Sequence, residues 1–68
     1  MNNANAIAAI LMKAVEEFKV CKRNKSGSVN QNAEYAIRKR EVAALMEQGE
    51  SRSEAFDMVN SLSRKYAV

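Results

Sequence analysis

The side chain with the most reactive chemistry in this sequence is that of a single cysteine, which stands beside two cationic residues. Cys21 precedes Lys22 and Arg23, and neighbouring positive charges favour a reactive thiolate. The sequence contains no histidine that could serve as a base for this thiol. Cys21 also extends an apolar spacing that includes Phe18. We therefore expect Cys21 to be buried and unreactive.

Two adjacent carboxylates, Glu16 and Glu17, are also poor candidates for a catalytic pair. Successive residues of a helix point about 100° apart, so these two carboxylates cannot converge on one substrate, and we interpret them as a solvated face. One cysteine and no histidine cannot supply the four Cys or His ligands of a structural zinc site. The sequence therefore predicts no catalytic residue, no metal, no cofactor and no small-molecule substrate, which argues against an enzyme.

Cationic residues gather in two short runs, KVCKRNK at residues 19–25 and RKR at residues 38–40. With a formal net charge of +3, these runs could contact phosphates or an acidic partner. A second interpretation stays open, because cations favour the C-terminal end of a helix and Glu34 and Glu41 lie within salt-bridge reach of Arg38. The candidate nucleic-acid or acidic-partner patch consists of Lys19, Lys22, Arg23, Lys25, Arg38, Lys39 and Arg40.

The composition favours helices that carry these residues in one small domain, residues 1–68. Proline is absent, glycine occurs twice, and alanine, glutamate, lysine, arginine and methionine are frequent. Hydrophobic residues make up 47% and charged residues 28%, which is typical of a globular chain. We predict an all-α fold of three helices at about residues 4–23, 31–48 and 52–66, a helical hairpin preceded by an N-terminal helix.

Local signals place the helix ends. Asparagines at positions 3 and 5 can cap the first helix, and the segment NKSGS at residues 24–28, whose Gly27 can adopt a left-handed conformation, follows it. Ser28 with Gln31, or Asn30 alone, can cap the second helix. Gly49 is expected to end the second helix, and a capping box formed by Ser51 and Glu54 to begin the third.

The helices carry more apolar surface than three short helices need to cover one another. The first helix has two adjacent apolar stripes, and the second has two separated ones, which is typical of a helix between two partners. Large uncovered apolar patches are rare on monomers, so we expect a helical homodimer. The candidate partner or dimer interface consists of Ile7, Leu11, Met12, Val15, Tyr35, Val42, Leu45 and Met46.

The segment VAALMEQGESRSEAFDMV resembles the beginning of a helix-turn-helix DNA-binding unit. That resemblance implies a recognition helix after a further tight turn, but NSLSRKYAV follows Val59 and contains no turn signal. We therefore predict a capped helical hairpin and not a complete helix-turn-helix. The same segment loosely resembles a ubiquitin-associated domain, yet Gln48-Gly49-Glu50 lacks the exposed aromatic residue of that domain's binding loop.

In size and composition the chain is similar to the small helical accessory proteins of bacteriophages and prophages, which modulate host machinery by binding. That resemblance implies a non-enzymatic protein-interaction module that regulates a partner protein. A small basic nucleic-acid-associated regulator is the alternative. The apolar segment at residues 6–15 is too short to span a bilayer and does not read as a signal peptide, so we expect a cytoplasmic protein that binds no membrane.

Overall fold

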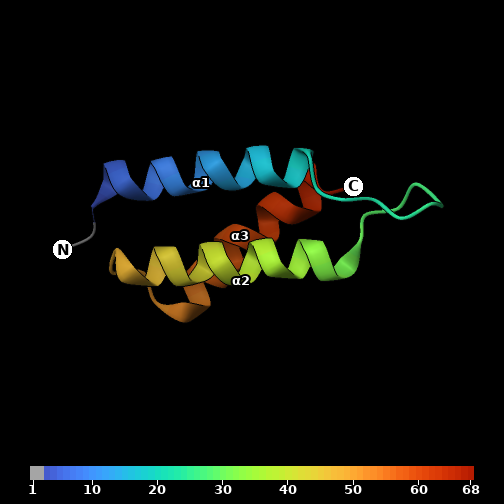
Figure 1. The fold of residues 1–68 in the computed structure, drawn as a ribbon. Coiled ribbons are helices and arrows are strands. Elements are labelled where there is room, and N and C mark those ends of the chain that lie inside the picture. Colours follow the sequence, from blue (N-terminus) through green and yellow to red (C-terminus); the bar gives the residue numbers. More distant parts are fainter. Residues whose placement is uncertain (1–2) are drawn as a thin grey trace.

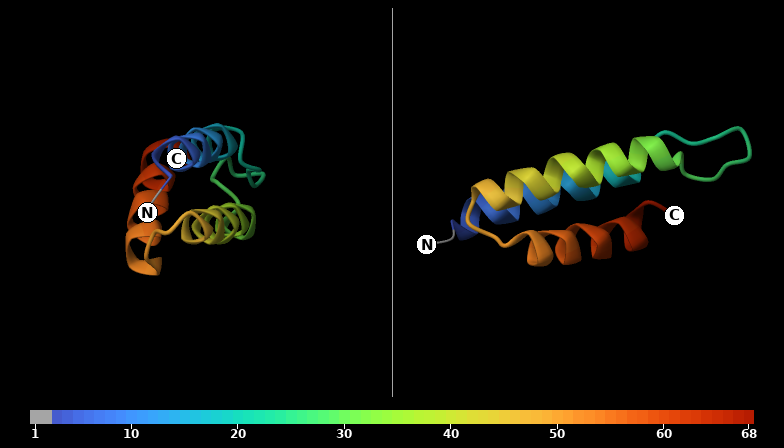
Figure 2. Two further views of the ribbon diagram at one scale, coloured as in Figure 1. Left: turned by 90° about the vertical axis from the view of Figure 1, so that its left-hand side faces the viewer. Right: turned by 90° about the horizontal axis from the view of Figure 1, so that it is seen from below.

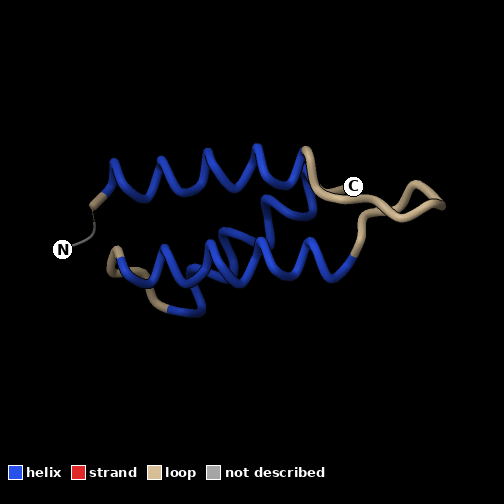
Figure 3. The backbone as a smooth tube through the Cα atoms, in the orientation of Figure 1, coloured by secondary structure: helices blue, strands red, loops and turns tan. Residues whose placement is uncertain are grey.

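The computed structural model describes residues 3–68 and confirms an all-α fold of three helices. Helix α1 spans Ala4–Lys19, α2 spans Gln31–Glu47 and α3 spans Arg52–Tyr66. Figure 1 shows α1 and α2 side by side and antiparallel, with α3 crossing behind them, and Figure 3 shows how little loop connects α2 to α3.

A polar side chain caps the start of each helix. The side-chain oxygens of Asn3, Asn30 and Ser51 each accept a hydrogen bond from the backbone N–H three residues later, at 3.1, 3.0 and 3.1 Å. Such bonds satisfy N–H groups that the first helical turn leaves without a partner. The structure thus confirms the Ser51 cap, and it selects Asn30 from the two alternatives for α2.

The turn after α2 confirms the predicted role of Gly49. Gly49 has a φ of 100°, a conformation that disfavours any residue with a Cβ atom. Its N–H donates to the carbonyl of Met46 at 3.0 Å, and the N–H of Glu50 donates to the carbonyl of Leu45 at 3.2 Å. This pair of bonds is a Schellman motif, which ends α2 and reverses the chain toward α3.

The predicted extension of the first helix to about Arg23 is wrong, because α1 ends at Lys19. Residues 22–30, which we call the arm, fold back on themselves with an isolated antiparallel bridge between Arg23 and Val29. Their backbone groups find partners across the arm instead of along a helix, and Gly27, with a φ of 91°, lies in the turn of the arm and not at the helix cap. The arm projects beyond the helices in Figures 1 and 2.

Each helix packs against the other two around a single small core. The end-on view in Figure 2 shows the three helices surrounding a common axis. The molecule is elongated, with extents of 44 × 18 × 15 Å. The fully or almost fully buried apolar side chains come from all three helices and are Ala14, Phe18, Val42, Leu45, Ala55 and Val59.

Candidate functional site

The structure divides the predicted partner interface between the core and the surface. Val42 and Leu45 are 4% and 0% exposed, so they pack inside one copy and cannot contact another molecule. Their assignment to an interface is wrong, because α1 and α3 together cover the side of α2 that carries them. Ile7, Leu11 and Val15 are half-buried, and the first two pack against the core.

Three members of the predicted interface remain on the surface. Met12 is 72% exposed, Tyr35 is 54% exposed and Met46 is 44% exposed. Met12 lies midway along α1, beside exposed Ala8 and Ala9, and with Lys13, Val15 and Glu16 it lines an open depression of ≈ 350 Å³. Tyr35 and Met46 are eleven residues apart on α2, about three helical turns, and therefore lie on the same outer stripe of that helix.

The predicted basic patch also divides. Lys19, Lys22, Arg23 and Lys25 are exposed at the end of α1 and in the arm, and Lys39 is exposed on α2. Arg38 and Arg40, however, form ion pairs with carboxylates of the same chain. These two side chains therefore contribute less free positive charge to a surface than the other five members of the predicted patch, although Arg40 itself is exposed.

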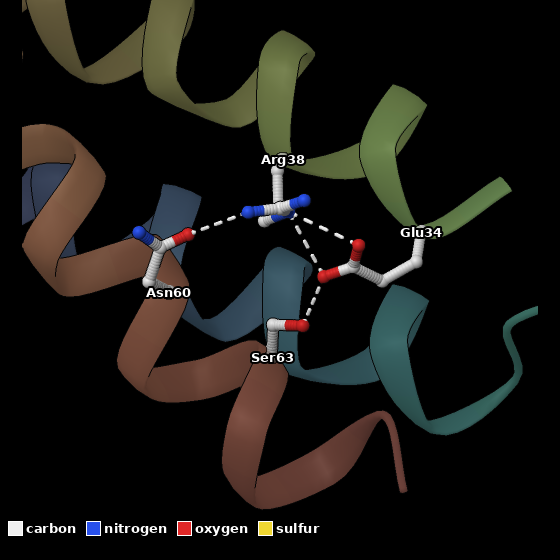
Figure 4. A network of polar contacts seen from close by, with 4 residues as sticks. All are labelled: Glu34, Arg38, Asn60 and Ser63. Atoms are coloured by element: carbon white, nitrogen blue, oxygen red, sulfur yellow. Dashed lines mark hydrogen bonds and ion pairs between the residues drawn. The ribbon is translucent and has the colours of Figure 1, made fainter. Parts of the chain in front are cut away.

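Arg38 belongs to a polar network that ties α2 to α3 (Figure 4). Its Nε lies 2.9 Å from one oxygen of Glu34, which confirms the predicted i,i+4 ion pair, and its Nη1 donates to the Asn60 side-chain oxygen at 3.0 Å. The Ser63 hydroxyl donates to the same Glu34 carboxylate. Ser63 is only 8% exposed, so this hydrogen bond satisfies a buried hydroxyl group. Four polar side chains thus fix how the two helices meet.

A pair of carboxyl groups between α1 and α2 contradicts the interpretation of Glu17 as part of a solvated face. Glu41 is 2% exposed, and the Oε2 atom of Glu41 and the Oε1 atom of Glu17 are both buried without a hydrogen-bond partner within the described residues. Arg40 forms an ion pair with the other oxygen of Glu17. Two buried acceptor oxygens without a donor are satisfied when one carboxyl group carries a proton.

The surroundings of Glu41 favour that protonated form. Burial, the hydrogen bond that forms with Glu17 when the pair holds a proton, and the negative charge of Glu17 raise the pKa of Glu41 from 4.5 to about 7, against the smaller opposing effects of Lys13 and Arg40. Glu41 lies four residues from Ile37 and four from Leu45, on a stripe whose other members pack in or against the core. This four-residue spacing from apolar core positions is the sequence signal that identifies Glu41 as a carboxyl group on a buried face.

The carboxyl pair suits a structural role better than a catalytic one. A pKa near 7 is in the range of a general acid or base, but such a group must reach its substrate. Glu41 is almost fully enclosed by the helices. Cys21 is likewise buried, as predicted, although it lies beyond the end of α1. No group of three or more potential metal ligands occurs among residues 3–68.

Comparisons with known proteins do not place the chain in a family. No family model, no curated protein and no solved structure matches it. Within the described part of the chain, no helix combines the length and the apolar character needed to cross a membrane. The function must therefore be inferred from the exposed surfaces themselves.

Proposed function

We propose that this chain is a non-enzymatic protein-interaction module, a small accessory or regulatory protein of the bacteriophage type that forms a homodimer and binds a partner protein. The observation that carries the proposal is the exposure of Met12 in the middle of α1. A methionine 72% exposed beside two exposed alanines and an open depression offers an apolar, adaptable contact surface. The charged groups at its border, Lys13 and Glu16, suit the polar rim of an interface.

The size of the chain supports the same proposal. A domain of 68 residues buries only about 60% of the surface that its unfolded chain exposes, and its stability is correspondingly low. Self-association is a common way for so small a domain to cover further apolar area. The outer stripe of α2, with Tyr35 and Met46, is a second exposed apolar surface.

The test is the oligomeric state of the Met12→Lys variant, measured by light scattering and sedimentation equilibrium over a range of protein concentrations. We expect the wild-type chain to dimerise and the variant to dissociate at least tenfold more readily, equivalent to about 1.4 kcal/mol, because a lysine ammonium is costly to bury. Val20→Lys is the matched control, because Val20 is 80% exposed but lies outside α1. A wild-type chain that stays monomeric at the highest concentrations would contradict the homodimer.

A further inference from the structure

Six of the eleven lysine and arginine residues lie at the end of the molecule from which the arm projects (Figure 1). Four of them belong to the cationic run at residues 19–25, and the last turn of α3 brings two more to the same end of the molecule. Helix α3 runs back toward the arm, so its last turn lies beside the end of α1. We call this cluster the basic end, and it consists of Lys19, Lys22, Arg23, Lys25, Arg64 and Lys65.

Specific contacts join the three segments of the basic end. The ammonium groups of Lys19 in α1 and Lys65 in α3 each lie 5.5 Å from the centre of the Tyr66 ring. The Arg23 guanidinium donates to the backbone carbonyl of Val68, which fixes the arm to the chain beyond α3. Arg64 lines a depression together with Val29 of the arm. These contacts hold the cations at one end of a 44 Å molecule.

The acidic residues neutralise this cluster only in part: Glu16 pairs with Lys19, and Glu34 lines the depression that contains Arg64. Four of the eight carboxylates lie toward the opposite end, in the last turn of α2, the turn after it and the first part of α3, and they are Glu47, Glu50, Glu54 and Asp57. Within residues 3–68, Lys19 is the one cation of the basic end with an ion pair, a solvent-exposed contact of 3.7 Å to Glu16. Such exposed pairs are weak, so the basic end keeps an excess of positive charge.

Hydrogen bonds order the backbone of the arm, which carries three of the cations, in the absence of a ligand. Across it, the N–H of Asn24 donates to the Ser28 carbonyl at 2.8 Å, and the N–H of Asn30 donates to the Lys22 carbonyl at 2.8 Å. The side-chain amide of Asn30 also donates to the Asn24 side-chain oxygen at 2.9 Å. Because the backbone is already ordered, binding costs less conformational entropy than it would for a flexible loop.

The chemistry of the arm fits phosphate oxygens. Beside its lysines, the arm and the start of α2 form a polar depression of ≈ 350 Å³, lined by Asn24, Ser28, Val29, Asn30, Gln31 and Asn32. Asparagine, glutamine and serine side chains are common donors to the phosphates of nucleic acids, alongside lysine and arginine. Contacts of lysine and arginine side chains with the phosphates release counterions, and contacts with the phosphate backbone do not require a particular base sequence.

Other polyanions fit less well. The arm contains no aromatic residue, and Tyr66 beside it is half-buried and already in contact with the ammonium groups of Lys19 and Lys65, so little ring surface is left on which an unpaired base could stack, which disfavours a single strand. The one apolar residue of the arm, Val29, is half-buried, and the exposed apolar residues that border the basic end, Val20 and Val68, are single small side chains. The basic end therefore lacks the large apolar anchors that dominate the energetics of protein interfaces and of interfacial membrane binding. We propose that the basic end binds the phosphate backbone of a nucleic-acid duplex, a function separate from self-association through Met12.

The experiment measures binding of a labelled random-sequence DNA duplex by fluorescence anisotropy between about 50 and 200 mM salt. Lys22 and Lys25 are exposed and form no ion pair within the described residues, so the K22E/K25E variant should keep its helical circular dichroism. For the wild-type chain we expect log K to fall linearly with log salt. In the variant we expect at least tenfold weaker binding and a slope smaller by about 2, near 0.9 for each lost phosphate contact.

The matched control is the K39E/R52E variant, which changes the net charge equally at two exposed positions away from the basic end. We expect it to bind the duplex much more tightly than K22E/K25E. Equal losses in the two variants would show that net charge alone matters and would overturn the proposal. So would failure of the wild-type chain to bind at low salt, or binding as tight to the single strand, polyglutamate or phosphatidylserine vesicles. A monomeric state would overturn only the homodimer.

Discussion

Glu41 is a carboxylic acid enclosed between α1 and α2, where its neutral form is favoured. Its pKa of about 7 means that the folded chain holds this proton through the range in which an ordinary glutamate is ionised. Lys13 and Glu17 face it from α1, and Arg40 is its neighbour on α2. Above pH 7 the pair carries two negative charges close together, and one of them is buried. This arrangement makes the contact between α1 and α2 sensitive to pH.

The Glu41→Gln variant tests this sensitivity. The folded-state pKa exceeds the ordinary value of 4.5, so the folded chain binds more protons than the unfolded chain between pH 4.5 and 7. The stabilisation from Glu41 is therefore fully present below pH 4.5 and is lost as the pH rises through 7, a change on the order of 3 kcal/mol. We expect urea unfolding of the wild-type chain to show lower stability at pH 8 than at pH 5.

In Glu41→Gln the glutamine amide can donate to Glu17 at every pH, so we expect most of that difference to disappear and the variant to be the more stable protein at pH 8. Glu47→Gln, at an exposed position of the same helix, is the matched control and should retain the wild-type dependence. An unchanged pH dependence in Glu41→Gln would show that other groups titrate.

At the level of helices, short connections and side-chain caps set the boundaries. The turn between α2 and α3 contains the Schellman bonds of Gly49 and Glu50 and the Ser51 cap, so every step of the reversal has a local hydrogen bond. Beyond the turn, the Glu34–Arg38–Asn60–Ser63 network fixes the contact between the same two helices. The hairpin of α2 and α3 is thus defined both by its turn and by a polar contact within the bundle.

Replacing Ser51 by alanine should weaken this hairpin. The variant loses the hydrogen bond from the Glu54 N–H to the Ser51 hydroxyl oxygen, and we expect the free energy of unfolding to fall by about 1 kcal/mol. Ser51→Asp should restore it, because a carboxylate also caps and interacts favourably with the helix dipole. Ser53→Ala, two residues later and exposed, is the control and should change stability little. Equal effects of the two alanine variants, measured by urea unfolding, would argue against the cap.

At the scale of the whole molecule, one small core serves all three helices. Phe18, Leu45 and Val59 are each 0% exposed and come from α1, α2 and α3. Because every helix depends on the same few side chains, the chain should unfold as one cooperative unit. The charges, in contrast, are spread along the long axis, with the basic end at the arm and acidic residues toward the other end.

Leu45 and Met46 provide the sharpest comparison of core with surface. They are neighbours in sequence, but Leu45 is 0% and Met46 is 44% exposed. We expect Leu45→Ala to lower the free energy of unfolding by about 2–5 kcal/mol, enough to unfold much of so small a domain, whereas Met46→Ala should cost about 0.5 kcal/mol or less. Thermal unfolding followed by circular dichroism measures both. A loss of similar size in the two variants would contradict the observed packing of α2.

The sequence by itself determined the helical class, the single domain and most helix ends. These depend on interactions within a few residues: the caps at Asn3 and Ser51, the left-handed glycine at position 49, and the apolar spacing along each helix. The pair formed by Glu34 and Arg38 belongs to the same group, because residues four apart on a helix are neighbours wherever that helix packs.

Only the tertiary structure decided which apolar residues are covered and which charged groups meet. Val42 and Leu45 belong to the core because α1 and α3 lie over them, and the partners of Arg40 and Glu41 stand on another helix, far away in sequence. The early end of α1 has a more local cause, since residues 22–24 pair with residues 28–30 across the arm in a way that the helical pattern did not predict. A helical period gives the direction of a side chain but not the neighbour in that direction, so the core positions and the charge partners depend on the packing of the three helices.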